Sequence, residues 1–313
     1  MQRVYRLTRQ VAQSNASVLL LGETGTGKEL AARAVHSWRS GEAGEFVAVN
    51  CAALTANLLE SELFGHVKGA FTDASTDRVG KFEYAHGGTI FLDEVGEIDY
   101  SLQAKLLKFL DSRTIRRISG TKFLPVDVRI ISATNADLKR AIDERLFRSD
   151  LYYRLNVLEI TLPPLRERPE DIRPIAEAYT KRFARRMNKK NTSLTEDVVT
   201  ALEEYFWPGN VRELINIIER AVLLNTSGRI SPHDLPIDKE HQETIINIEE
   251  EQGTIRVNLP PEGASLDEIE RGVILAALAR TGGNVTQTAG LLKVGRGTLR
   301  YKMKKYGFSR KTF

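Results

Sequence analysis

Cysteine is almost absent from this chain of 313 residues, which contains only Cys51. A single thiol cannot form an internal disulfide, so a disulfide-stapled secreted domain is excluded. The five histidines show no metal-ligand spacing with that cysteine or with one another. We therefore expect no structural metal site.

Long apolar runs are also missing. No segment approaches the roughly 18 consecutive apolar residues that cross a bilayer, and the N-terminal stretch MQRVYRLTRQ lacks the apolar core of a signal peptide. We expect a cytoplasmic protein with no membrane partner. With 42% hydrophobic and 27% charged residues, the composition is that of a globular protein, and the length predicts two or three domains.

Acidic residues are absent from the C-terminal end, 271–313. The basic residues of that stretch are Arg271, Arg280, Lys293, Arg296, Arg300, Lys302, Lys304, Lys305, Arg310 and Lys311. Just upstream, DKEHQETIINIEEEQGT is acidic and poor in aromatics, which is typical of a solvated linker. The pattern predicts a separate basic module that binds nucleic acid. A merely solvated lysine face is the alternative.

A glycine loop follows the first apolar run, in ASVLLLGETGTGKELAARAVHSW. The segment predicts a strand, a loop and a helix, in which backbone N–H groups surround phosphate oxygens while a lysine reaches the outer phosphates. The nucleotide-binding residues predicted are Gly22, Glu23, Thr24, Gly25, Thr26, Gly27, Lys28 and Glu29. Glu29 stands where Ser or Thr usually binds magnesium, so the ion must rely on other groups. A plain glycine turn is the alternative.

Two carboxylates follow a second buried-looking strand, in GGTIFLDEVGEI. Asp93 is placed to hold Mg²⁺, usually through water, and Glu94 to orient and polarise the attacking water. Alone, such a pair is often a helix cap or a solvated turn. After a phosphate loop in the same chain, the catalytic interpretation is favoured.

Further strands end in Asn50 and Asn135. Strands that alternate with helical stretches predict a mainly parallel sheet with helices on both faces, and ligands gather at the carboxyl ends of such strands. Lys28, Asn50, Asp93, Glu94 and Asn135 would then share one crevice.

Six motifs occur in series: GETGTGKE, GAFTDA, GGTIFLDEV, SATNADL, FRSDLYYRLNV and WPGNVRELIN. In this order they closely resemble the AAA+ domain of NtrC-type bacterial enhancer-binding proteins, the ATPases that activate sigma-54 RNA polymerase. The tail GNVTQTAGLLKVGRGTLRYKMKKYGF resembles their Fis-type helix-turn-helix. The resemblance covers nearly the whole chain. It implies an α/β AAA+ P-loop NTPase with a parallel sheet, a helical lid subdomain and a C-terminal all-α helix-turn-helix domain.

The expected domains are an α/β ATPase subdomain at 1–163, a helical lid at 164–236, a linker at 237–262 and a helix-turn-helix domain at 263–313. Within the lid, Pro208 and Gly209 would end one helix, Asn210 would cap the next, and Glu213 would complete a capping box. Compared with the family, the chain begins late and no receiver or GAF domain precedes it. We expect either a piece of a longer regulator or regulation from outside.

The resemblance also implies roles for single residues. The family forms rings, usually hexameric, with ATP at each interface, and a hexamer or heptamer is expected here. Asn50 resembles the switch residue that contacts Glu94, and Asn135 resembles sensor I. Arg148 and Arg154 match the arginine fingers that act on a neighbouring subunit, and a surface ion pair beside Asp150 is the alternative. Arg212 matches sensor II, and pairing with Glu213 or Glu219 is its alternative.

The segment Gly69, Ala70, Phe71, Thr72, Asp73 and Ala74 resembles the family's GAFTGA loop. In the family this loop presses its Phe and Thr, here Phe71 and Thr72, onto sigma-54, and an exposed aromatic suits a protein contact. Asp73 replaces the family's second glycine, which restricts the backbone and adds a carboxylate. The change is either tolerated, tuned to a particular sigma-54, or a sign of lost activation.

In the tail, a helix from Gly283-Asn284 to Leu292 and a turn precede the candidate recognition helix, 296–306. Its N-terminal residues would meet base edges. The DNA contacts expected are Arg296, Thr298, Arg300 and Tyr301, with Lys302, Lys304 and Lys305 on phosphates. Lys293 at the usual turn glycine and Gly297 within the helix suggest an altered site preference. One face of the preceding helix, with Leu266, Ile269, Val273 and Ala277, suits a dimer contact.

Together with these observations, the resemblance implies an ATPase that binds double-stranded enhancer DNA and remodels the closed complex of sigma-54 RNA polymerase holoenzyme. A DNA-binding regulator whose AAA+ domain only oligomerises or senses nucleotide is the alternative. A nucleic-acid motor such as a helicase has no supporting feature beyond the ATPase core.

Overall fold

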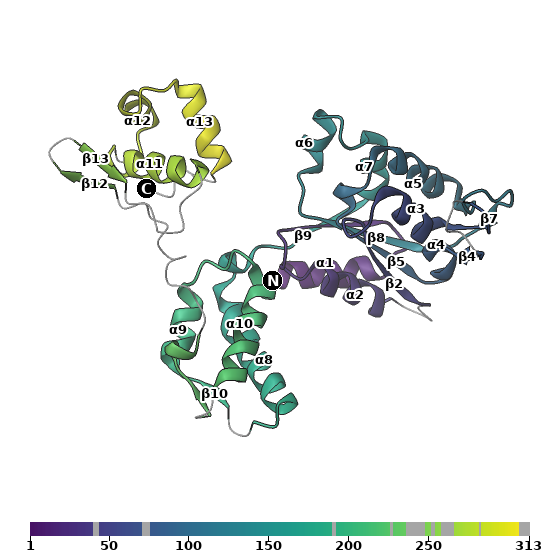
Figure 1. Cartoon of the computed structure of the whole chain (residues 1–313), viewed down its shortest axis with the longest axis horizontal. Helices are drawn as coiled ribbons and strands as arrows, with labels where there is room; N and C mark the ends of the chain where they lie inside the picture. The colour runs from purple at the N-terminus through teal and green to yellow at the C-terminus, as the bar shows by residue number, and fades with distance from the viewer. Residues whose placement is uncertain are drawn as a thin grey trace. The chain divides into compact units, whose positions relative to one another are not determined.

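The computed structural model of the chain contains two compact units, Met1–Pro236 and Ile237–Phe313. Figure 1 shows their helices and strands. The residues described are 1–39, 44–70, 76–189, 192–225, 228–235, 248–251, 254–257, 266–281 and 283–306.

The first unit is built on a five-stranded sheet in the order β2-β5-β8-β1-β9. Its strands are β1 (Val18–Leu21), β2 (Phe46–Asn50), β5 (Thr89–Asp93), β8 (Arg129–Thr134) and β9 (Leu158–Thr161). Every neighbouring pair is parallel, which confirms the predicted sheet. The edge strand β9 was not among the strands predicted. All carboxyl ends meet at one edge of the sheet.

Helices cover both faces of this sheet, as the sequence predicts (Figure 1). Because successive strand residues point to opposite faces, the apolar strands supply two cores. Leu19 packs into the core beneath one helical layer, whereas Val18 and Leu20 pack into the other. One layer contains α3 (Ala56–Phe64), α4 (Lys81–Tyr84), α5 (Tyr100–Ser112) and α7 (Ser149–Leu155), and the other contains α1 (Gln2–Ala12) and α2 (Lys28–Ser37).

Smaller elements complete this part of the unit. They are the antiparallel pairs β3 (Gly65–His66) with β4 (Arg78–Val79) and β6 (Thr114–Ile115) with β7 (Leu124–Pro125), the 3₁₀ turn η1 (Val95–Glu97), and α6 (Leu138–Asp143).

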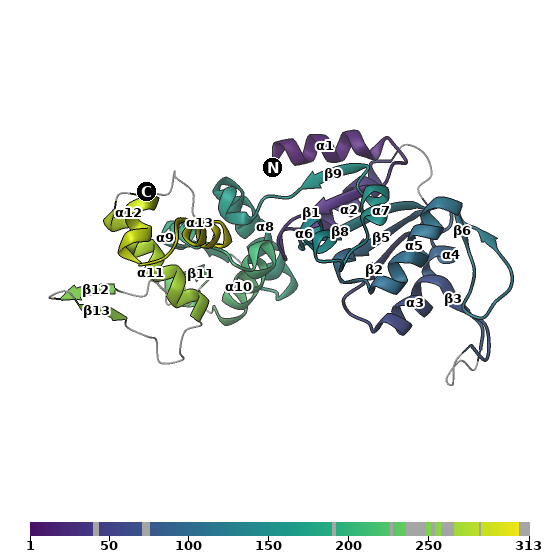
Figure 2. The ribbon, with the colours of Figure 1, turned by 90° about the horizontal axis from the view of Figure 1, so that it is seen from above.

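A helical subdomain follows the sheet, and Figure 2 shows the chain leaving β9 and entering it. Its helices are α8 (Ile172–Arg186), α9 (Glu196–Glu204) and α10 (Asn210–Leu224), with the short elements η2 (Leu165–Glu167), η3 (Pro169–Asp171), β10 (Ser193–Leu194), β11 (Arg229–Ile230) and η4 (Pro232–Asp234). Trp207 is fully buried, and its indole N–H donates to the Leu202 carbonyl at 2.8 Å. This hydrogen bond satisfies the indole N–H, which is the one polar group of the side chain. The buried Trp207 side chain anchors the turn that leads into α10.

The second unit contains α11 (Leu266–Arg280), α12 (Val285–Leu291) and α13 (Arg296–Lys305). Asn284 caps α12, since its side chain accepts from the amides of Thr286 and Gln287. The core consists of Ile274, Leu278, Ala289, Leu299 and Met303. Ala277, expected on a dimer face, is 6% exposed within the unit, whereas Leu266 is 83% exposed.

Two strands also belong to this unit, β12 (Ile248–Glu251) and β13 (Thr254–Val257), which pair antiparallel. They lie in the stretch that composition assigns to a linker. Isoleucine, threonine and valine within these segments favour extended backbone, a local preference that the overall acidity of the stretch conceals. Across the described residues, no helix has the length and apolarity needed to traverse a membrane.

Candidate active site

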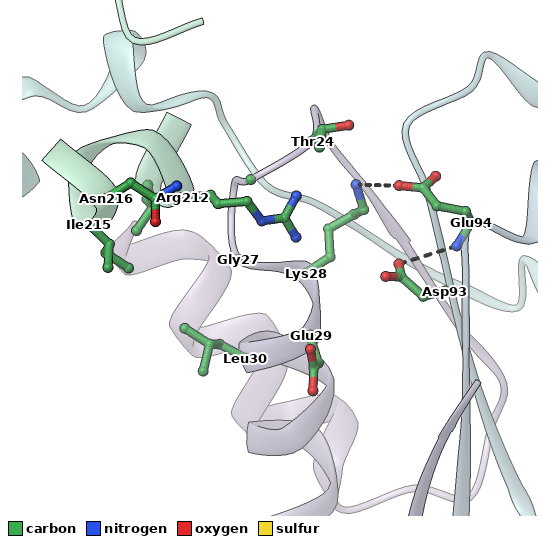
Figure 3. Close-up of a pocket in the computed structure, with 12 residues that line it drawn as sticks. Thr24, Gly27, Lys28, Glu29, Leu30, Asp93, Glu94, Arg212, Ile215 and Asn216 are labelled. Carbon is green, nitrogen blue, oxygen red and sulfur yellow. Dashed lines mark hydrogen bonds and ion pairs between the residues drawn. The ribbon is translucent and has the colours of Figure 1, made fainter. Parts of the chain in front are cut away.

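The glycine loop joins β1 to α2 at the carboxyl edge of the sheet (Figure 3). Gly25 and Gly27 have φ angles of 81° and 102°, in the left-handed region that favours glycine. Gly27 is the N-cap of α2 and has no side chain to occupy its first amides. The loop and the N-terminus of α2 therefore offer backbone N–H groups to an anion.

Lys28 is the first residue of α2, and its side chain is only 6% exposed. Its ammonium donates to the carbonyls of Gly22 at 2.9 Å and Glu23 at 3.3 Å. Nζ also lies 3.6 Å from Oε1 of Glu94. The predicted lysine thus lies between the loop and the predicted catalytic carboxylate.

Asp93 and Glu94 lie side by side at the end of β5. The Glu94 amide donates to Asp93 Oδ1 at 3.2 Å, and Glu94 has a φ of 53°. A positive φ is uncommon for a residue with a side chain, and the Glu94 carboxylate lies beside the Lys28 ammonium. Burial raises the pKa of Asp93, the Glu94 charge raises it further, and Lys28 partly offsets both.

Asn135 enters the same crevice from the end of β8. Its backbone N–H donates to Glu94 Oε2 at 3.2 Å, and its side-chain amide donates to Thr24 Oγ1 at 3.0 Å. Asn135 thereby joins the phosphate loop to the predicted catalytic carboxylate.

The predicted contact between Asn50 and Glu94 is not made in this structure. Asn50 Oδ1 instead accepts from the Ala52 amide at 2.9 Å. The Glu94 carboxylate is held by Lys28 and Asn135. The bond to Ala52 is favoured because that amide is only two residues away along the chain and its position does not depend on how distant segments pack.

A pocket of about 230 Å³ opens between the loop and α10. Its lining consists of Thr24, Gly25, Gly27, Lys28, Glu29, Leu30, Asp93, Glu94, Val211, Arg212, Ile215 and Asn216. Figure 3 shows the Arg212 guanidinium extending from α10 towards Lys28. The alternative pairing of Arg212 is not observed, since Glu219 binds Arg186 and Glu213 binds the Gly209 amide. The Glu29 carboxylate pairs with Arg33.

Three residues of the helical subdomain that sequence reasoning did not assign to the site contact the loop directly. Asn210 does not cap α10 as predicted. It is fully buried, accepts from the Leu165 amide at 2.7 Å, and donates to Glu23 and to the Thr24 carbonyl, each at 3.1 Å. Arg166 binds Glu23, and Arg168 binds the Thr26 carbonyl. The one available signal was two arginines in the charged stretch LRERPED just after a strand.

The predicted arginine fingers are both paired within their own chain. Arg148 donates to Asp150 at 3.1 and 2.8 Å, which is the alternative that the sequence left open. Arg154 lies 3.2 Å from Asp111. Their guanidinium groups lie on the surface, with side chains 31% and 53% exposed.

The base of the GAFTDA loop is closely packed. Gly65 and Gly80 lie back to back in β3 and just after β4, where a Cβ on Gly65 would lie 2.4 Å from the Arg78 carbonyl oxygen. The loop continues through Gly69 and Ala70. The predicted contact residues Phe71, Thr72, Asp73 and Ala74 lie outside the described residues.

Four of the predicted DNA contacts lie within the first six residues of α13, and all four are exposed: Arg296, Thr298, Arg300 and Tyr301. The Lys302 ammonium pairs with Glu270, and Lys305 binds Asp267 at 2.8 Å. The absence of acids after residue 270 concealed these pairs, because the partners come from the preceding helix. The side chain of Lys304 lies outside the described residues.

Cys51 offers a test of how tightly the crevice is packed. The residue is 2% exposed, and burial, assisted by the charges of Asp93 and Glu94, raises the pKa of its thiol to about 12. We expect iodoacetamide at pH 8 to label nucleotide-free folded protein at least about 100-fold more slowly than urea-unfolded chain, because the thiolate is the nucleophile. Mass spectrometry counts this single site, and equal rates in the two states would contradict the packing described.

Comparison with known proteins finds three matching domains in this chain. Residues 1–161 match the sigma-54 interaction domain, residues 166–250 the AAA+ ATPase lid domain, and residues 265–306 the bacterial regulatory protein, Fis family. The regulatory protein AtoC of Escherichia coli K12 is 44% identical over 98% of this chain and 66% of its own length. The formate hydrogenlyase transcriptional activator FhlA of the same organism is 46% identical over 99% of this chain and 44% of its own.

Among solved structures, NtrX from Brucella abortus in complex with ATP matches with a TM-score of 0.69 and 33% identity, over 98% of this chain and 67% of that one. An NtrX structure with ADP matches similarly, with a TM-score of 0.70. The chain spans less than two thirds of the curated relatives AtoC and FhlA. Since the sigma-54 interaction domain covers more than half of it, the chain belongs to the family of AAA+ proteins with a sigma-54 interaction domain.

Proposed function

We propose that this chain is a sigma-54-dependent transcriptional activator: a ring-forming ATPase that binds enhancer DNA and uses ATP hydrolysis to remodel the sigma-54 RNA polymerase closed complex. The observation that carries the proposal is the meeting of Lys28, Glu94 and Asn135 around one glycine loop, in a chain that also carries a Fis-type helical unit. The proposed domains are those expected from the sequence, 1–163, 164–236 and 263–313, with 237–262 as a connecting segment that includes the strand pair β12 and β13.

Each side chain of the site has a separate role in ATP hydrolysis. When ATP enters, its phosphate oxygens take over the Lys28 donors that now go to the Gly22 and Glu23 carbonyls. Glu94 orients the attacking water, and Asn135 holds Glu94 at its Oε2. Arg212 reaches the nucleotide from α10, so that the helical subdomain closes over it. The negative charge that spreads over the transferred phosphoryl group is then surrounded by cations.

Mg²⁺ fits the carboxylate pair. Burial and the neighbouring Glu94 charge raise the pKa of Asp93, and a divalent cation relieves that electrostatic cost. Asp93 would hold the ion, usually through water. Bound there, it supplies neutralisation of the outer phosphates.

The same crevice has a direct structural route to the proposed sigma-54 loop. The Cys51 amide, just after Asn50, donates to the Asp93 carbonyl at 2.9 Å. From there α3 runs to Gly65, the base of the loop. We infer that the Asn50 side chain exchanges its bond to Ala52 for one to Glu94 in another nucleotide state, which shifts α3 and moves Phe71 and Thr72 towards or away from sigma-54.

The proposal is tested by ATP-dependent open-complex formation with purified sigma-54 holoenzyme on premelted and duplex promoter DNA. We expect open complexes on duplex DNA only with hydrolysable ATP. Hydrolysis without open complexes would instead assign a DNA-binding ATPase whose loop, with Asp73, does not couple to sigma-54. The same assay with the Asp73→Gly variant distinguishes a chain whose loop is weakened by the aspartate from a chain that has no sigma-54 activity.

Within α13, the arginines and the paired lysine should differ in their effect on DNA binding. Arg300 forms no ion pair among the described residues, whereas Lys305 is held by Asp267. We expect Arg300→Ala to weaken binding by about 10- to 100-fold, and Lys305→Ala by less than about threefold. The measurement is fluorescence anisotropy at fixed salt, on a site selected by the intact chain from random DNA. Equal losses would contradict the assignment of Arg300 to bases.

A further inference from the structure

The side chain of Glu23 points away from the nucleotide pocket and into the helical subdomain, although Glu23 belongs to the phosphate loop. Its carboxylate receives two hydrogen bonds from Arg166, at 2.7 and 2.5 Å. A third comes from the Asn210 side chain at 3.1 Å. This bidentate, charge-assisted geometry is the strong form of an arginine-carboxylate pair. The hydrogen bonds from Arg166 lower the pKa of the Glu23 carboxyl, so it is ionised at neutral pH.

Backbone contacts reinforce the same junction. The Arg212 amide donates to the Gly25 carbonyl at 3.3 Å. A Cβ added to Gly25 would lie 2.2 Å from the Gly209 carbonyl oxygen, so loop and turn touch without side chains between them. Asn210 has a φ of 54°, a conformation that asparagine tolerates better than most residues, and this directs its amide group at both the loop and Leu165.

Arg168 makes the junction a two-point attachment. Its side chain is 5% exposed and donates to the Thr26 carbonyl at 3.0 Å, with Asp171 3.7 Å away. A buried guanidinium must keep its partners, because an uncompensated buried charge is costly. The helical subdomain therefore holds the loop at Glu23 on one side and at Thr26 on the other.

From this geometry we propose that Glu23 and Arg166 are positioning residues for ATP binding: the pair fixes the phosphate loop to the helical subdomain, and Arg166 cancels a carboxylate that would otherwise repel the triphosphate. The inference rests on the proposed function in taking ATP as the ligand. Neither residue needs to touch the nucleotide. Both act through the loop backbone and through the charge beside it.

The two parts of this role predict a sign for the coupling between the residues. Arg166→Gln removes the cation and leaves the Glu23 carboxylate uncompensated beside the phosphates, a like-charge repulsion. In the Glu23→Gln background the same change removes no neutraliser, because no carboxylate is present. Arg166→Gln should therefore weaken ATP binding more in the otherwise intact chain than in the Glu23→Gln background.

The experiment is a double-mutant cycle that measures the Kd of a fluorescent ATP analogue for the intact chain, Glu23→Gln, Arg166→Gln and the double variant. We expect Arg166→Gln to weaken binding by about three- to tenfold, and the double variant to bind more tightly than that single variant. Arg166→Lys, which keeps the charge but not the fork, should lie between the intact chain and Arg166→Gln. Arg173→Gln is the matched control, since the ion pairs of Arg173 among the described residues are with Glu177 and Glu196, inside the helical subdomain.

A second readout separates positioning from a general loss of structure. Hydrogen exchange of the loop amides, 22–28, should accelerate in Arg166→Gln without nucleotide, while α2 and the sheet keep their protection. In steady-state hydrolysis, KM should rise with little change in kcat. Additive Kd changes in the cycle, or unchanged exchange at the loop, would overturn the inference. Because exchange needs neither hydrolysis nor polymerase, it reports on the junction even if the proposed activator function fails.

Discussion

Replacing Glu94 by glutamine is expected to slow ATP hydrolysis by about 10²–10⁴-fold while ATP affinity stays within about threefold. The glutamine side chain keeps the shape of glutamate and still accepts the hydrogen bond from the backbone N–H of Asn135, but it cannot polarise water as a carboxylate does. The ion pair with Lys28 at 3.6 Å is also lost. Because that pair competes with ATP for Lys28, its loss does not weaken binding.

The measurement is phosphate release at saturating ATP, with affinity from a fluorescent analogue. Glu97→Gln is the matched control: Glu97 is an exposed glutamate three residues further along, in η1. If Glu94→Gln kept more than about a tenth of the rate, water activation would have to be assigned to another group. In the polymerase assay the same variant should bind promoter and holoenzyme but form no open complex on duplex DNA.

Replacing Arg148 or Arg154 by alanine is expected to reduce hydrolysis by about 10³–10⁵-fold, if each completes the site of a neighbouring subunit. In the isolated chain both are paired with local acids, Arg148 with Asp150 and Arg154 with Asp111. These pairs lie at the surface and are therefore weak, so assembly can exchange them for phosphate at small cost. ATP binding should persist in both variants, because neither residue lines the pocket.

Mixing subunits tests whether these arginines act on a neighbour. Neither Glu94→Gln nor Arg148→Ala should hydrolyse ATP alone. In mixed rings, however, a subunit with intact Glu94 can receive the arginine of an adjacent Glu94→Gln subunit, because ring interfaces are head-to-tail. A random equal mixture then restores on the order of a quarter of the sites. No recovery on mixing would place the arginine in its own subunit's site or in structure alone, and Arg154→Ala is tested in the same way.

The parts of the site that lie close together along the chain were predictable. Lys28 and Glu94 were identified from a strand, a glycine loop and a carboxylate pair, and the structure brings them within 3.6 Å. Asn135 was placed correctly in the same crevice because the ends of parallel strands share an edge of the sheet. Asn50 was placed at that edge too, but its partner was not predictable: the Ala52 amide competes with Glu94, and a strand pattern does not rank two acceptable hydrogen bonds.

The sequence by itself determined the phosphate loop, the carboxylate pair, the basic helical unit and the family, because each is written in contiguous residues with local geometric demands. Only the tertiary structure decided which partners the charged side chains bind. Glu23 meets Arg166 and Asn210 across 143 and 187 positions, and Lys305 meets Asp267 across 38. Such pairs depend on how separate helices and loops pack. The spacing of residues along the chain does not predict these pairs, because a charged side chain binds whichever partner the folded structure places within reach.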